Sequence, residues 1–100
     1  MEITIQSFHL QPGKKLLDAV ENKFRKIERI YERITICEVT LRKKKTSDQK
    51  SCVVEAKLYV PGKVIFTKEK AESFETALNK VIYELKQQLT EYKELLNEVR

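Results

Sequence analysis

The segment SCVVEAKLYVPGKVIFTKE, residues 51–69, decides the fold, because it predicts two strands joined by a tight turn. In residues 51–60 apolar side chains recur at every second position, namely at Cys52, Val54, Ala56, Leu58 and Val60. This period of two is typical of a strand with one buried face. Pro61 and Gly62 form a strong turn signal, and a further strand is expected over residues 63–69. The pattern leaves open which side chains of that last strand face inward.

Two more strands are expected before this hairpin. Residues 35–42 alternate, with Cys37, Val39 and Leu41 on one side, and residues 1–8 alternate with Ile3 and Ile5 on one side. The polar stretch KKKTSDQK, residues 43–50, suits a long hairpin loop between the second and third strands. If that hairpin is symmetric, Cys37 and Cys52 lie nearly opposite one another.

Two amphipathic helices are predicted by apolar residues that recur every three or four positions. In residues 14–34 these are Leu16, Leu17, Val20, Phe24, Ile27, Ile30, Tyr31 and Ile34, which predict five to six turns. In residues 72–99 they are Phe74, Leu78, Val81, Leu85, Leu89, Tyr92, Leu96 and Val99. Ser73 is the expected N-cap of the second helix, with Thr76 in the capping-box position.

The predicted order is therefore strand, helix, three strands, helix, in one domain that spans residues 1–100. A right-handed crossover makes the first two strands parallel neighbours, and the hairpins make the others antiparallel. This order predicts an α+β fold with a four-stranded mixed sheet and both helices packed on one face. The other face is left to solvent or to a partner.

The charge of this chain is unevenly distributed. Twenty Lys and Arg residues oppose fifteen Asp and Glu residues, which gives a net charge of +5. Residues 1–70 carry a net +7 and residues 71–100 a net −2. On a helical wheel, basic residues of the first helix gather on one flank: Lys15, Lys26, Arg29 and Arg33, with Lys23 at the edge of the apolar stripe. Glu21, Glu28 and Glu32 fall on the opposite flank.

The second helix repeats this segregation of charge. Lys86, Lys93 and Arg100 share one flank, whereas Glu84, Glu91 and Glu98 share the other. A helix selected only for solubility would intersperse the two signs to form stabilising pairs. Both basic flanks, together with Arg42 and the loop lysines such as Lys44, therefore predict a surface for a polyanion. The competing interpretation is an ordinary solvated face with chance clustering.

Other functional classes have weaker support in the sequence. We expect no enzyme, because the chain has no Gly-rich phosphate loop and His9 has no evident catalytic partner. One histidine and two cysteines give no zinc pattern, and we expect no cofactor or metal. Cys37 and Cys52 are expected to be small buried residues, with a cross-strand redox pair as the alternative. Without a presequence or a long apolar run, we expect a cytoplasmic protein with no membrane contact and no small-molecule substrate.

Point charges on helix flanks contact phosphates without reading a base sequence, which favours structured RNA recognised by its shape.

Four segments of this chain also resemble one protein family: LLDAVENKFRKIERIYERI, TLRKKK, VVEAKLYVPGKVIFTKE and SFETALNKVIYELKQQLTEYKE. In this order they resemble the ribosome hibernation-promoting factors, also called ribosome-associated inhibitors or sigma-54 modulation proteins. The resemblance covers nearly the whole chain.

This resemblance implies a fold whose last part is similar to a double-stranded-RNA-binding domain. It implies docking on 16S rRNA of the small ribosomal subunit, in the channel for tRNA and mRNA, which inhibits translation in stationary phase or starvation. Residue by residue, it assigns RNA contacts most directly to Lys23, Lys26, Arg33, Arg42 and Lys93. The charge pattern adds Lys15, Arg29, Lys44 and Lys86. With no counterpart of the second domain of long members, we expect a short-type factor that does not pair ribosomes by itself. The resemblance leaves open whether it promotes pairing together with a second protein or opposes pairing.

The sequence departs from the family pattern at Glu84, Gln87 and Glu91, where basic residues are typical. If this flank faces RNA, reversing the charge at Glu84 and Glu91 should tighten binding.

The main alternative to RNA binding is a protein-interaction module or sigma-factor modulator, acting through the apolar end of the second helix at Tyr92, Leu96 and Val99. A third alternative, an RNA-processing enzyme, would need a metal-binding acidic cluster. The acidic residues lie on the wrong flank for it.

Overall fold

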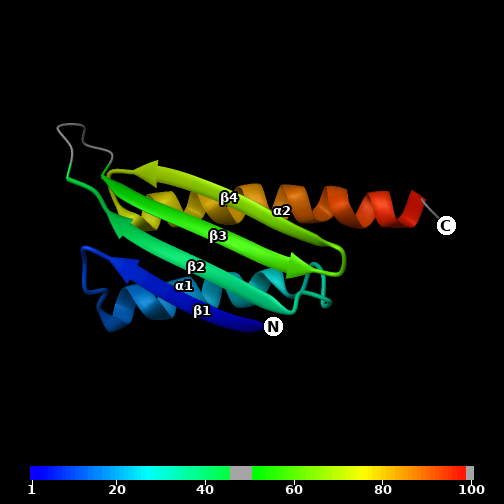
Figure 1. Cartoon of the computed structure of the whole chain (residues 1–100), viewed down its shortest axis with the longest axis horizontal. Helices are drawn as coiled ribbons and strands as arrows, with labels where there is room; N and C mark the ends of the chain where they lie inside the picture. The colour runs from blue at the N-terminus through cyan, green and yellow to red at the C-terminus, as the bar shows by residue number, and fades with distance from the viewer. Residues whose placement is uncertain (46–50, 99–100) are drawn as a thin grey trace.

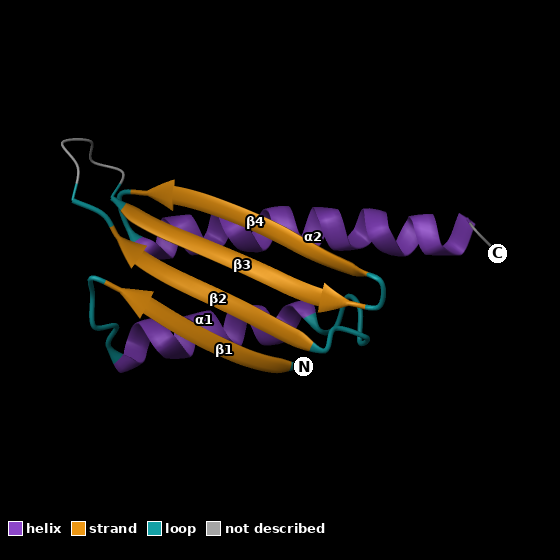
Figure 2. Ribbon diagram, viewed as in Figure 1, coloured by secondary structure: helices purple, strands orange, loops and turns teal. Residues whose placement is uncertain are grey.

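The protein is a four-stranded sheet with two helices behind it, as a computed structural model describes for residues 1–45 and 51–98 (Figure 1). The elements are β1 (Glu2–Phe8), α1 (Lys14–Ile27), β2 (Ile36–Lys43), β3 (Cys52–Val60), β4 (Lys63–Ala71) and α2 (Phe74–Glu98). The sheet order is β1-β2-β3-β4, with β1 parallel to β2 and the other pairs antiparallel. Both helices lie on one face, so the predicted architecture is confirmed (Figure 2).

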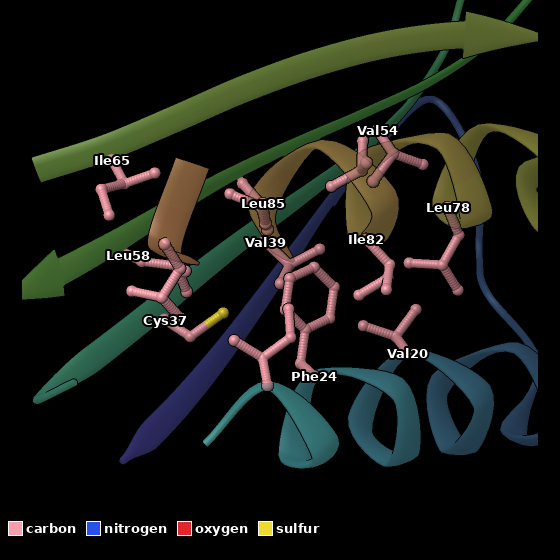
Figure 3. Packing of buried hydrophobic residues seen from close by; sticks show 14 of the residues in the cluster. Val20, Phe24, Cys37, Val39, Val54, Leu58, Ile65, Leu78, Ile82 and Leu85 are labelled. Carbon is pink, nitrogen blue, oxygen red and sulfur yellow. The ribbon is translucent and has the colours of Figure 1, made fainter. Parts of the chain in front are cut away.

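The core lies between the helices and this face of the sheet (Figure 3). Every second residue of β2 and β3 points into it, while Val20 and Phe24 of α1 meet Leu78 and Leu85 of α2. In β4 the inward residues are Ile65, Thr67 and Ala71, which resolves the orientation that the sequence left open. The opposite face of the sheet carries no helix.

The first helix is shorter than predicted, because α1 ends at Ile27 instead of residue 34. The N–H groups of Glu28, Arg29 and Ile30 each bond to the carbonyl three residues back, at 3.2, 3.2 and 2.9 Å. These tighter turns end the α-helix. Ile30 and Ile34 continue the helical spacing of apolar residues in the sequence, because both side chains pack against the core from the irregular segment that follows α1. Arg29 and Arg33 therefore belong to this connection and not to a helix.

The bounds of the other elements differ from the predicted bounds by one or two residues. The predicted end of α2 at residue 99 lies outside the described part of the chain. Ser73 is the N-cap of α2, since its Oγ accepts a 3.1 Å hydrogen bond from the N–H of Thr76. The end of α2 extends past the β3–β4 turn (Figure 1). Leu95 and Leu96 are 56% and 41% exposed there. The predicted overhang is thus present, whereas Val99 lies outside the described residues.

The predicted juxtaposition of the two cysteines is wrong. Cys37 stands opposite Leu58, and Cys52 stands opposite Lys43. Six positions of β2 separate the two cysteines, about 20 Å at 3.3 Å per residue, which excludes a cross-strand pair. Both are free and buried, as the other interpretation expected. Of the predicted loop, residues 46–50 lie outside the described part.

Candidate nucleic-acid interface

The basic flank of α1 faces α2. The Lys23 ammonium, on this flank, donates a hydrogen bond to the side chain of Asn79 in α2. Lys26 lies one turn later on the exposed side of the helix. The acidic flank faces β1 instead, where the Glu28 carboxylate pairs with the Met1 ammonium at 2.6 Å. Arg25 lies on this side as well and pairs with Glu21 and Glu28, so the side of α1 toward β1 carries both signs of charge.

A hollow of about 380 Å³ lies where the segment after α1 meets the end of α2, and we call it the interhelix hollow. It is lined by residues 28–33 and by Lys93 of α2. The Lys93 ammonium donates a 2.7 Å hydrogen bond to the backbone carbonyl of Ile30, which joins α2 to this segment. Arg33 and Lys93 also line an adjacent hollow of about 300 Å³. Cations from distant parts of the sequence thus converge here.

The electrostatics of the interhelix hollow are cationic. Arg29, Arg33 and Lys93 supply three positive charges, whereas Glu28 and Glu32 supply two negative ones. The Met1 ammonium hydrogen-bonds the Glu28 carboxylate and lowers its pKa, so this acid is already neutralised by a partner. Phosphate oxygens would therefore meet an excess of donors.

Aromatic contacts stabilise the wall of the interhelix hollow. The rings of Tyr31 and Tyr92 pack edge to face with centroids 6.0 Å apart. The Tyr92 hydroxyl donates a 2.6 Å hydrogen bond to the carbonyl of Pro61 in the β3–β4 turn. The segment that carries Arg29 and Arg33 is consequently held against α2 and the turn.

A second basic hollow, of about 540 Å³, lies at the far end of β2, and we call it the strand-end hollow. It is lined by His9, Arg42, Lys43, Lys44 and Lys45. The Arg42 guanidinium lies 4.7 Å from the centroid of the Phe8 ring, on the sheet face that carries no helix. The Lys43 ammonium contacts the Cys52 sulfur at 3.3 Å.

The nine predicted contact residues thus fall into separate groups. Arg29, Arg33 and Lys93 meet at the interhelix hollow, with Lys23 and Lys26 on the adjoining flank of α1. Arg42 and Lys44 lie at the other end of β2, and Arg42 is about 20 Å from Ile36 at its start, as six residues at about 3.3 Å each imply. Lys15 lies in the first turn of α1.

Lys86 lies in neither hollow, and borders a shallow surface with Tyr83 and Glu91. The sequence analysis had counted Lys43 and Lys45 among the loop lysines of the predicted polyanion surface, and it had not included His9 in that surface.

Glu84, on the acidic flank of α2, lies over β4. The buried Thr67 hydroxyl donates a hydrogen bond to the Glu84 carboxylate. Hydrogen bonding with Glu69 and then with Thr67 lowers the pKa of Glu84. Glu84 therefore does not line the interhelix hollow.

Two searches of the described residues gave negative results. In residues 1–45 and 51–98, no group of three or more His, Cys, Asp or Glu side chains could hold a metal ion. No helix in the same residues has the length and apolar character needed to cross a membrane.

The fold and this surface define a class of small α+β domains with a cationic hollow beside two helices. The family model described as sigma 54 modulation protein / S30EA ribosomal protein matches residues 3–97. The chain belongs to this family, which confirms the resemblance seen in the sequence.

Solved structures agree with this assignment at the level of fold. A ribosomal subunit interface protein from Coxiella burnetii has a TM-score of 0.83 at 19% identity, covering 94% of this chain and 99% of its own. The N-terminal domain of Protein Y from Thermus thermophilus has a TM-score of 0.78 at 19% identity, covering 92% of this chain and 99% of its own. The comparison with curated proteins gave no match.

Proposed function

We propose that this protein is a ribosome hibernation factor of the cytoplasm. It docks on 16S rRNA of the small ribosomal subunit, in the channel that tRNA and mRNA occupy, and inhibits translation in stationary phase or starvation. The mechanism is occlusion by electrostatic docking, in which no bond is made or broken. Family membership supports the ribosomal partner, and the relative named as a ribosomal subunit interface protein is in keeping with it.

One observation carries this proposal: cations from two parts of the chain that are distant in sequence converge at one hollow. Lys93 of α2 reaches the segment that carries Arg29 and Arg33, while Glu84 of α2 turns toward β4. Chance clustering on a solvated face does not require distant segments to bring three cations to one hollow. A converging set of cations suits closely spaced phosphates.

The strand-end hollow extends the contact. Its lysines follow β2, about 20 Å from the start of that strand at Ile36, a span that a folded RNA covers with several phosphates. Contacts to phosphates position the protein without reading sequence. The docked protein would then exclude other RNA from the same channel.

The test is co-sedimentation with purified small subunits across a salt series. The wild type should pellet stoichiometrically at low salt and dissociate steeply as salt rises, because phosphate contacts release counterions. Arg33→Glu and Lys26→Glu should weaken binding and reduce the salt slope by about one per lost contact. Lys57→Glu is the matched control, since Lys57 is exposed on β3 on the sheet face without helices. Equal losses in all three variants would contradict the proposal.

A second candidate function, a protein-interaction module, is favoured by the exposed Leu95 and Leu96 on the overhang of α2. Apolar docking depends weakly on salt, so the same salt series separates the two functions. Binding that persists at high salt and is lost in Leu96→Ser would favour this candidate.

A further inference from the structure

The two edges of the sheet differ in protection. At the β4 edge, the Gln88 side chain of α2 donates a 3.2 Å hydrogen bond to the carbonyl of Phe66. Lys63, Lys68 and Lys70 also lie along this strand. Edge lysines and covering helices are the usual devices that prevent strands from pairing with other chains. The β4 edge is therefore guarded.

The β1 edge is less protected in the described residues, where the Arg25 side chain of α1 reaches it at the Met1 carbonyl alone. Between Ile3 and Phe8 the sequence is ITIQSF, which has no charge, proline or glycine and a high content of strand-forming residues. Phe8 is 41% exposed. Figure 1 shows β1 as the outermost strand, with its free side turned away from β2.

The register identifies the backbone groups on this free side. The N–H of Glu2 bonds to the carbonyl of Thr35, so the backbone of Glu2, and of every second residue after it, faces β2. The N–H and C=O groups of Ile3, Ile5 and Ser7 consequently point outward. No group in the described part of the chain is seen to bond them. At the start of the strand, Arg25 already donates a 2.7 Å hydrogen bond to the carbonyl of Met1.

We propose that the β1 edge binds a second copy of this chain, antiparallel and two-fold symmetric about Ile5. This register places Ile5 opposite Ile5 of the other copy and Ile3 opposite Ser7. All three outward residues of each strand then find complementary N–H and C=O partners, which joins two sheets into one of eight strands.

Charge complementarity selects a second copy as the occupant. In this register Glu2 of one copy stands opposite Phe8 of the other, and the Arg42 guanidinium lies over that Phe8 ring. Each dimer therefore brings Glu2 near Arg42 twice. The adjoining flank of α1 carries Glu21 and Arg25, and both side chains are exposed. Where this flank meets its copy, each protomer therefore offers one negative and one positive side chain.

The experiment is sedimentation velocity of the full chain from micromolar to millimolar concentration. The wild-type mass should rise from 11.8 kDa toward twice that value. Ser7→Pro should remain monomeric, because proline removes an outward N–H while leaving the ladder to β2 intact. Ser7→Ala, which keeps the N–H, is the matched control and should dimerise. Circular dichroism establishes whether each variant is folded.

Charge variants keep the test decisive if Ser7→Pro fails to fold. Glu2→Arg and Arg42→Glu should each weaken the dimer by about two- to thirtyfold, since two like-charged pairs form per dimer, and the double variant should restore it. A wild type that stays monomeric at all concentrations would overturn the proposal. A β1 edge that binds another protein while this chain stays monomeric would overturn it too. A dimer that persists in Ser7→Pro would overturn it as well.

Discussion

The ammonium of Lys93 in α2 is hydrogen-bonded to the backbone carbonyl of Ile30 at 2.7 Å, across 63 residues of sequence. This bond connects the end of the second helix to the segment that carries Arg29 and Arg33. Lys93 therefore has a structural role besides its expected contact with RNA. Its ammonium has three donors, so two of them stay available to a ligand.

The first prediction concerns this bond. Lys93→Met should lower the free energy of unfolding by about 1–3 kcal/mol, because a charge-assisted hydrogen bond is lost and the Ile30 carbonyl loses its partner. Urea denaturation measures this change. Lys86→Met is the matched control, since Lys86 is exposed two turns earlier on α2 and no contact ties it to α1 in the described residues. Equal stability of the two variants would show that the bond contributes little.

The second prediction concerns the acidic flank of α2. Glu84→Lys should leave affinity for the small subunit unchanged, because Glu84 lies over β4 and not in the interhelix hollow. It should also reduce stability by about 1 kcal/mol, since the buried Thr67 hydroxyl loses its acceptor. Co-sedimentation and urea denaturation measure the two effects. A clear gain in affinity would instead mean that this flank faces RNA.

The third prediction is a pH dependence. The pKa values of Glu28 and Glu84 are lowered below the usual 4.5, Glu28 chiefly by its hydrogen bond with the Met1 ammonium and Glu84 chiefly by hydrogen bonding with Glu69. Carboxylates with a lowered pKa in the folded state stabilise it fully above the unfolded value, and this contribution is lost as the pH falls. The urea midpoint should therefore decline below about pH 4.5. In Glu84→Gln this decline should be smaller, and an unchanged decline would exclude Glu84 as a contributor.

The fourth prediction concerns Cys37. Burial raises the pKa of its thiol to about 12, so the reactive thiolate is scarce near pH 8. In a Cys52→Ala variant, Cys37 should react with Ellman's reagent only after denaturant is added. Oxidants should not produce an intramolecular disulfide in the wild type, because Cys37 pairs with Leu58 across the hairpin. Rapid labelling of the native variant would contradict the buried placement.

Much of the fold could be predicted from local patterns. Alternation at Cys37, Val39 and Leu41 and the Pro61-Gly62 turn predicted the strands, and Ser73 predicted the start of α2. These signals are local, because side-chain period and turn chemistry depend on neighbouring residues. The end of α1 could not be predicted in this way. Ile30 and Ile34 keep a helical spacing although the chain has left the helix.

The candidate site could likewise be predicted only in part. The sequence by itself determined that each helix separates its charges, since a helical wheel follows from residue spacing alone. Only the tertiary structure decided that Lys93 meets the segment of Arg29 and Arg33, that Glu84 turns toward Thr67, and that Arg42 lies on the opposite sheet face beside Phe8. The reason is physical: the direction of a flank depends on how the helices pack on the sheet, and strand register determines which distant residues become neighbours.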